Sequence, residues 1–100
     1  MYGQQIIATY ERVRALGLTS SREDFSVDWC GRSPDLLRDY DRRSGAMARV
    51  SPQTVAYVRA RLAEVTQLLP AGVAAEVRSI DDRLIQDTAV ASLIGRWSFR

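Results

Sequence analysis

Apolar side chains recur at spacings of three and four residues along almost the whole chain, which is the period of amphipathic helices. The clearest case is a continuous seam formed by Val55, Val58, Leu62, Val65 and Leu69. No segment before the last few residues keeps the alternation of polar and apolar positions that a half-buried strand needs. The pattern predicts an all-α fold, a compact bundle of about five helices in residues 4–16, 21–28, 34–43, 52–69 and 72–94, the last of these being a long C-terminal helix.

Glycine, proline and small polar residues mark where these helices begin and end. Gly17 follows the first helix, where a left-handed residue usually closes a C-terminus. Ser33-Pro34-Asp35 and Ser51-Pro52 each place an N-cap serine before a proline at the first helical position. Pro70 separates the fourth helix from the fifth. The 100 residues are therefore expected to form one domain.

The second and third predicted helices are short and are joined by a tight turn with a glycine, which is the arrangement of a helix-turn-helix. The stretch S-S-R-E-D-F-S-V-D-W-C-G-R-S-P-D-L-L-R-D-Y-D-R-R-S-G, residues 20–45, resembles the helix-turn-helix of Cro and repressor-type (lambda-repressor-like) bacterial regulators. The matching positions are Phe25 and Ser26 at the family's Leu-Ala pair, Gly31 at its turn, Ser33 at the start of the recognition helix, Tyr40 and Asp41 at the aromatic-Glu pair, and Gly45 at the closing glycine.

The chain departs from that family's pattern in two ways. The turn is one residue longer if Gly31 and Tyr40 both align, and Cys30 is then the extra residue. The recognition helix also carries Asp35 and Asp39, whose carboxylates repel phosphate.

All 14 basic residues are arginine, and they outnumber the 12 acidic residues by two. Residues 31–61 hold seven arginines and three acids, so the positive charge is concentrated where the resemblance places a DNA duplex. Arg38 is the candidate for a bidentate contact with guanine, unless it pairs with Asp35 or Asp41 on the helix surface. The full set of candidate DNA-binding residues is Arg32, Ser33, Asp35, Arg38, Asp39, Arg42, Arg43 and Arg49.

Several function classes are disfavoured by what the sequence lacks. There is no histidine and only one cysteine, so neither a zinc site of the usual kind nor a nucleophile-base pair is expected, and the chain is not expected to be an enzyme or to need a cofactor or a metal. Asp81, Asp82 and Asp87 are expected to be a solvated face, and Cys30 an unreactive thiol. No apolar run is long enough for a membrane span, and the first residues do not read as a secretory signal, which predicts a cytoplasmic protein.

The fifth predicted helix has two apolar edges, more than one contact with the fourth helix would cover. We therefore divide the domain into residues 1–69, the helix-turn-helix DNA-binding part, and residues 70–100, a C-terminal dimerisation helix and tail of the same domain. The tail either folds back on the core, swaps onto a partner subunit or docks on another protein. The expected dimer interface consists of Val77, Ile80, Leu84, Ile85, Leu93, Trp97 and Phe99.

The sequence thus predicts a small bacterial, sequence-specific transcription regulator that binds double-stranded DNA as a homodimer. The alternative is a helical protein-protein interaction module, an adaptor or inhibitor, that has lost DNA binding, and Asp35 and Asp39 favour it. Under either hypothesis Phe25, Trp29 and Tyr40 lie on the apolar edges of their helices and are expected in the core rather than against a ligand.

Overall fold

The computed structural model describes residues 1–42, 45 and 47–97, with only the backbone of residues 92 and 94–97. Its helical elements are α1 (Gly3–Ala15), α2 (Arg22–Asp24), the π-helical turn η1 (Phe25–Trp29), α3 (Leu36–Tyr40), α4 (Pro52–Thr66) and α5 (Ala71–Trp97). Within these described ranges no β-strand forms, and the only sheet-like pairing is an isolated bridge between Tyr2 and Arg49. The predicted all-α fold with a long C-terminal helix is confirmed.

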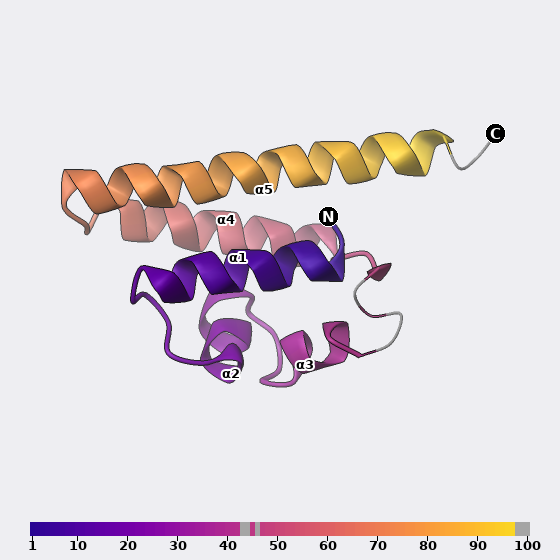
Figure 1. Cartoon of the computed structure of the whole chain (residues 1–100), viewed down its shortest axis with the longest axis horizontal. Helices are drawn as coiled ribbons and strands as arrows, with labels where there is room; N and C mark the ends of the chain where they lie inside the picture. The colour runs from indigo at the N-terminus through magenta and orange to yellow at the C-terminus, as the bar shows by residue number, and fades with distance from the viewer. Residues whose placement is uncertain (43–44, 46, 98–100) are drawn as a thin grey trace.

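The two longest helices form an antiparallel hairpin, and the rest of the chain packs against one side of it (Figure 1). Residues 67–70 join α4 to α5, and α1 lies along α5. The shorter elements α2, η1 and α3 lie below α1, with η1 also contacting α4. Because α5 is much longer than α4, its C-terminal end extends beyond the other helices (Figure 1).

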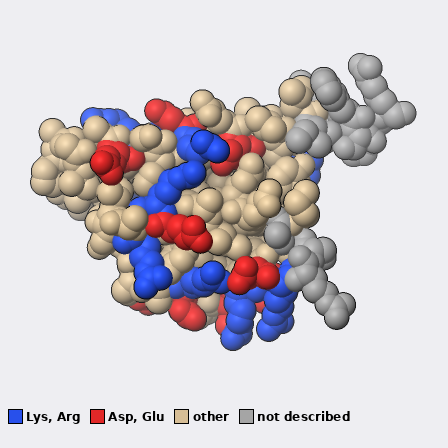
Figure 2. Space-filling view, in the orientation of Figure 1, with Lys and Arg blue, Asp and Glu red and all other residues tan. Residues whose placement is uncertain are grey.

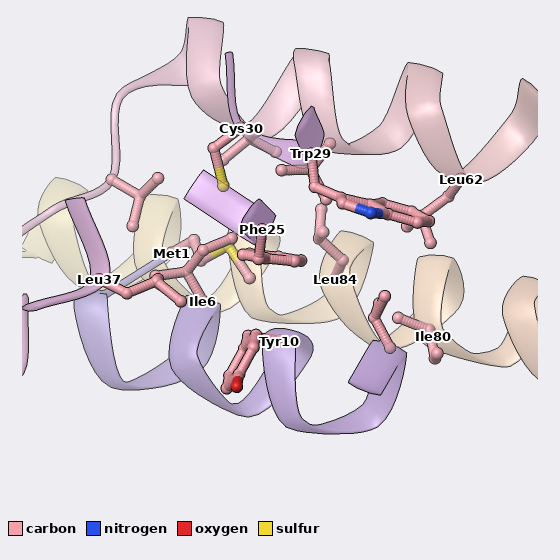
Figure 3. Packing of buried hydrophobic residues seen from close by; sticks show 14 of the residues in the cluster. Met1, Ile6, Tyr10, Phe25, Trp29, Cys30, Leu37, Leu62, Ile80 and Leu84 are labelled. Atoms are coloured by element: carbon pink, nitrogen blue, oxygen red, sulfur yellow. The ribbon is translucent and has the colours of Figure 1, made fainter. Parts of the chain in front are cut away.

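One hydrophobic core joins these elements, and Phe25 lies near its middle (Figure 3). The Phe25 side chain has no exposed surface, and its ring stands edge-on to Tyr10 of α1, with 5.5 Å between the ring centroids. It also stacks on Trp29, 6.2 Å away. Phe25 and Trp29 are therefore core residues, as predicted, and the half-buried Tyr40 packs at the edge of the same cluster.

The inward edge of α5 belongs to this core as well. Val77, Ile80 and Leu84 are buried in the cluster that α5 shares with α1 and α4. The assignment of these three residues to a dimer interface is therefore wrong, because an apolar helix edge that is already covered within one chain is not available to a second.

The start of α4 follows the predicted signals, whereas α4 ends at Thr66 instead of position 69 and both bounds of α3 differ from the prediction. Ser51 caps α4, its hydroxyl accepting a hydrogen bond from the Thr54 N–H at 3.2 Å, with Pro52 as the first helical residue. In contrast, α3 begins at Leu36 instead of position 34 and ends at Tyr40, and Ser33 contributes its backbone carbonyl rather than its hydroxyl to the first turn. Leu37 is the only buried residue of α3, so a longer helix here would have no further apolar side chain in the core to hold it.

The turn that leads to Cys30 and Gly31 is π-helical. The Cys30 N–H bonds to the Phe25 carbonyl five residues earlier, at 3.1 Å, so this turn holds one residue more than an α-helical turn. Gly31 follows with φ of +64°, a conformation that residues with a side chain rarely adopt. Both Phe25 and Trp29, at the two ends of this wider turn, are buried in the core.

We predict that replacing Trp29 by alanine will lower the free energy of unfolding by about 3 to 5 kcal/mol, because it empties the volume between η1 and α4 that the indole fills. Urea or thermal unfolding measures the effect. Val27→Ala is the control on the same turn, since Val27 is 44% exposed and should change stability little. A Trp29→Ala variant with an unchanged melting temperature would contradict the packing described above.

Candidate nucleic-acid interface

The segment predicted to be a helix-turn-helix contains α2, η1 and α3, which we call the two-helix unit (residues 22–40). The unit has two arms, the first formed by α2 and η1 and the second by α3. Ser26 joins them, because its hydroxyl donates to the Arg22 carbonyl at 2.8 Å and accepts from the Leu37 N–H at 3.4 Å. At the outer end Arg22 forms an ion pair with Asp41, with 2.9 Å between the charged atoms. The hydrogen bond to Asp41 raises the pKa of Arg22, so the guanidinium stays charged. The arms are therefore fixed to each other at both ends.

The turn between the two arms is fastened to α4. Arg32 donates from Nε to the Thr54 hydroxyl and from Nη2 to the Ser51 hydroxyl, both at 3.0 Å. The Tyr57 ring lies over Gly31, so close that a Cβ atom at that position would approach the ring to 2.8 Å. Arg32 was predicted as a DNA contact, and its guanidinium instead binds the N-terminal turn of α4.

The outward side of α3 carries both signs of charge. Arg38 and Asp35 form an ion pair with 2.6 Å between Nη2 and Oδ1, so the alternative considered for Arg38 is the one observed. Asp39 and Ser33 are exposed beside this pair. Arg42 is exposed too, and no hydrogen bond or ion pair joins it through its side chain to the part of the chain that is described. Arginine side chains extend from the lower edge of the molecule, over α2 and α3, with carboxylates next to them (Figure 2).

Arg49 and Arg43 are the two remaining arginines that were predicted to bind DNA. Arg49 donates from Nη2 to the Ala91 carbonyl of α5 at 3.0 Å and lies over the Tyr2 ring, 5.8 Å from its centroid. Arg49 therefore links the loop after α3 to α5 and the N-terminus. Arg43 lies outside the described residues.

The surface around α2, η1 and α3 is less positive than the charge count for residues 31–61 indicated. Residues 20–43 hold five arginines against six carboxylates, a net charge of −1. On α4, Arg59 is paired with Asp81 of α5 at 2.9 Å and Arg61 with Glu64 at 3.4 Å. Both carboxylates lie outside residues 31–61, so they offset part of the positive charge counted for that range. The sequence count missed the Arg59–Asp81 pair because residues 22 positions apart become neighbours only after folding.

No metal centre or membrane-spanning helix is found in the ranges that the structure describes. These residues contain no group of three or more histidine, cysteine or acidic side chains placed to hold a metal ion, and no helix long and apolar enough to cross a bilayer. Asp81 pairs with Arg59 and Asp87 with Arg83 of its own helix. Asp81 and Asp87 are thus each paired with an arginine.

The exposed apolar side chains of α5 lie in its second half. Ile85 and Leu93, both predicted for the dimer interface, are 43% and 48% exposed, and Val90, which the sequence reading missed, is 52% exposed. Val90 lies off the regular stripe of the predicted edge, so spacing alone gave no signal for it. The Trp97 side chain and Phe99, also predicted for this interface, lie outside the described residues.

No protein-family model, curated protein or solved structure matches this chain. The assignment of a function therefore depends on the residues and contacts described above.

Cys30 gives a prediction about pH. Burial raises the pKa of this thiol from its ordinary value of 9.0 to about 12, an effect that the nearby Arg32 partly opposes. The folded chain therefore keeps the proton between these values while the unfolded chain loses it, so the free energy of unfolding should fall as the pH rises above about 9. Urea unfolding at several pH values measures this, with Cys30→Ala as the control. An equal loss of stability in both proteins above pH 9 would show that other groups cause it.

Proposed function

We propose that this chain is a small DNA-binding protein, a regulator of the helix-turn-helix kind, in which α3 enters the major groove. The observation that carries the proposal is the position of α3: Leu37 anchors it in the core, while Arg38, Asp39 and Arg42 stand exposed on the outside. A short helix fixed by Ser26 on one side and by the turn around Gly31 on the other is a rigid support for side chains that read base edges.

Phosphate contacts in this proposal come from the margins of α3. Arg42 follows the helix, and Ser33 precedes it with its hydroxyl exposed. Arg32 supports the site indirectly, because it fixes the turn to α4. With a net charge of −1 in residues 20–43, non-specific attraction to the duplex should be weak, and binding should depend on base contacts more than on charge.

The same proposal includes a homodimer, because two-fold symmetric proteins of this kind read two half-sites about 34 to 36 Å apart. Ile85, Val90 and Leu93, the large exposed apolar side chains in the second half of α5, are the proposed contact.

A helical protein-protein interaction module is the second candidate function. Two of the predicted DNA-binding arginines, Arg32 and Arg49, bind groups within the fold, and Arg38 is neutralised by Asp35. A surface of this mixed charge, together with an exposed apolar edge on α5, also suits a partner protein. Failure of the next experiment would favour this candidate.

We predict salt-sensitive binding to double-stranded DNA. Fluorescence anisotropy measures it, starting at low salt, with labelled duplexes that the wild-type chain has selected from a randomised pool. Arg42→Ala should weaken binding to all sequences by a similar factor and reduce the slope of log affinity against log salt by about 1. Arg78→Ala, which removes an exposed arginine from α5, is the matched control and should leave binding unchanged. Absence of binding to any duplex at low salt would contradict the proposed function.

We also predict a homodimer that Leu93→Glu disrupts, because the substitution places a charge in the proposed apolar contact. Light scattering at about 100 µM protein, a concentration well above a micromolar dissociation constant, measures the change from dimer to monomer. Ala75→Glu adds the same charge to an exposed position near the other end of α5 and should leave the dimer intact. A monomeric wild-type protein, or a Leu93→Glu variant that still dimerises, is the result that excludes this interface.

A further inference from the structure

The outward face of α3 has a regular order of charges. Asp35 at the N-cap and Arg38 and Asp39 within the helix stand at positions i, i+3 and i+4, which share one face, and all three are exposed. Arg42, also exposed, follows the C-terminal end of the helix. Leu37 points the opposite way into the core. The face therefore presents two carboxylates, which accept hydrogen bonds, on either side of one planar, multi-donor guanidinium group.

The Asp35–Arg38 pair is not needed to hold the fold together. Its side chains are 57% and 63% exposed, and exposed ion pairs of this type contribute little to stability. The pair uses one terminal nitrogen of the guanidinium, Nη2, and one carboxylate oxygen, Oδ1. The other donors of Arg38 and the second oxygen of Asp35 are left for a ligand, and the pair holds the two groups side by side before that ligand arrives.

The edge of one base pair offers the complementary set of groups. In the major groove guanine presents the acceptors O6 and N7, and the cytosine paired with it presents the N4 amino donor. Thymine presents an acceptor and a methyl group, and a phosphate presents only acceptors, so a carboxylate facing either of them is repelled or left without a partner.

We propose that Asp35 and Arg38 act together as the element that selects a G·C base pair, Arg38 donating to guanine and Asp35 accepting from the cytosine amino group. This inference rests on the proposed DNA-binding function and deepens it by naming the sequence feature that the duplex must contain. Asp35 is then a specificity determinant, and its negative charge close to the duplex has a use.

The experiment compares binding patterns rather than affinity alone. A duplex is selected from a randomised pool with the wild-type full chain, and each of its base pairs is replaced in turn. Wild-type affinity should fall about 5- to 150-fold when one particular G·C pair becomes A·T, the range expected for a good bidentate contact. Both Arg38→Gln and Asp35→Asn should reduce that discrimination to a small factor, while their melting temperatures stay at the wild-type value.

Asp28→Asn is the matched control, since it removes an exposed carboxylate from η1 instead of α3 and should preserve the discrimination. If Asp35→Asn binds every duplex more tightly by the same factor and keeps the wild-type pattern, Asp35 only repels phosphate and the inference is wrong while DNA binding stands. If the wild-type chain binds no duplex in the pool, the proposed function itself fails and the inference fails with it.

Discussion

The burial of Phe25 is the interaction on which the rest of the structure depends. Helices of three or five residues are unstable alone in water, so α2, η1 and α3 exist only because their apolar side chains reach a shared core. Phe25 contacts Tyr10 of α1 on one side and Trp29 on the other, and through Trp29 the turn meets α4. Because the core fixes η1, the Ser26 hydroxyl can hold Leu37 and so set the position of α3.

The sequence predicted the helices well where one apolar edge and a cap agree, and less well where packing decides. The serine-proline start of α4 and the glycine after α1 were both predicted from local chemistry, and Gly17 has the expected φ of +76°. The length of α3 and the burial of Val77, Ile80 and Leu84 depend on which surfaces meet in three dimensions. Periodicity identifies an apolar edge of a helix without showing what covers it, so the two edges of α5 could not be told apart.

The sequence predicted where the candidate site lies in the chain, but not which groups its arginine side chains bind. Local charge located an arginine-rich segment, yet Arg32 turns to the hydroxyls of Ser51 and Thr54, and Arg49 to a carbonyl of α5. A guanidinium has five donors and binds any nearby oxygen, so the use of each arginine depends on the acceptors that folding brings to it. The Asp35–Arg38 pair was foreseeable because its members are three residues apart on one helix face.

The charge balance limits how such a site could work. If the chain binds DNA as we propose, the excess of carboxylates over arginines in residues 20–43 means that attraction to the duplex backbone would not provide most of the affinity, in contrast to the usual DNA-binding domain. Weak attraction to phosphate also means weak binding to incorrect sequences, because non-specific affinity arises almost entirely from this term. A rigid unit that presents paired donors and acceptors would thus gain selectivity where it loses affinity. A dimer formed through α5 would bring a second α3 to the duplex, and the doubled base contacts would recover the affinity without added charge.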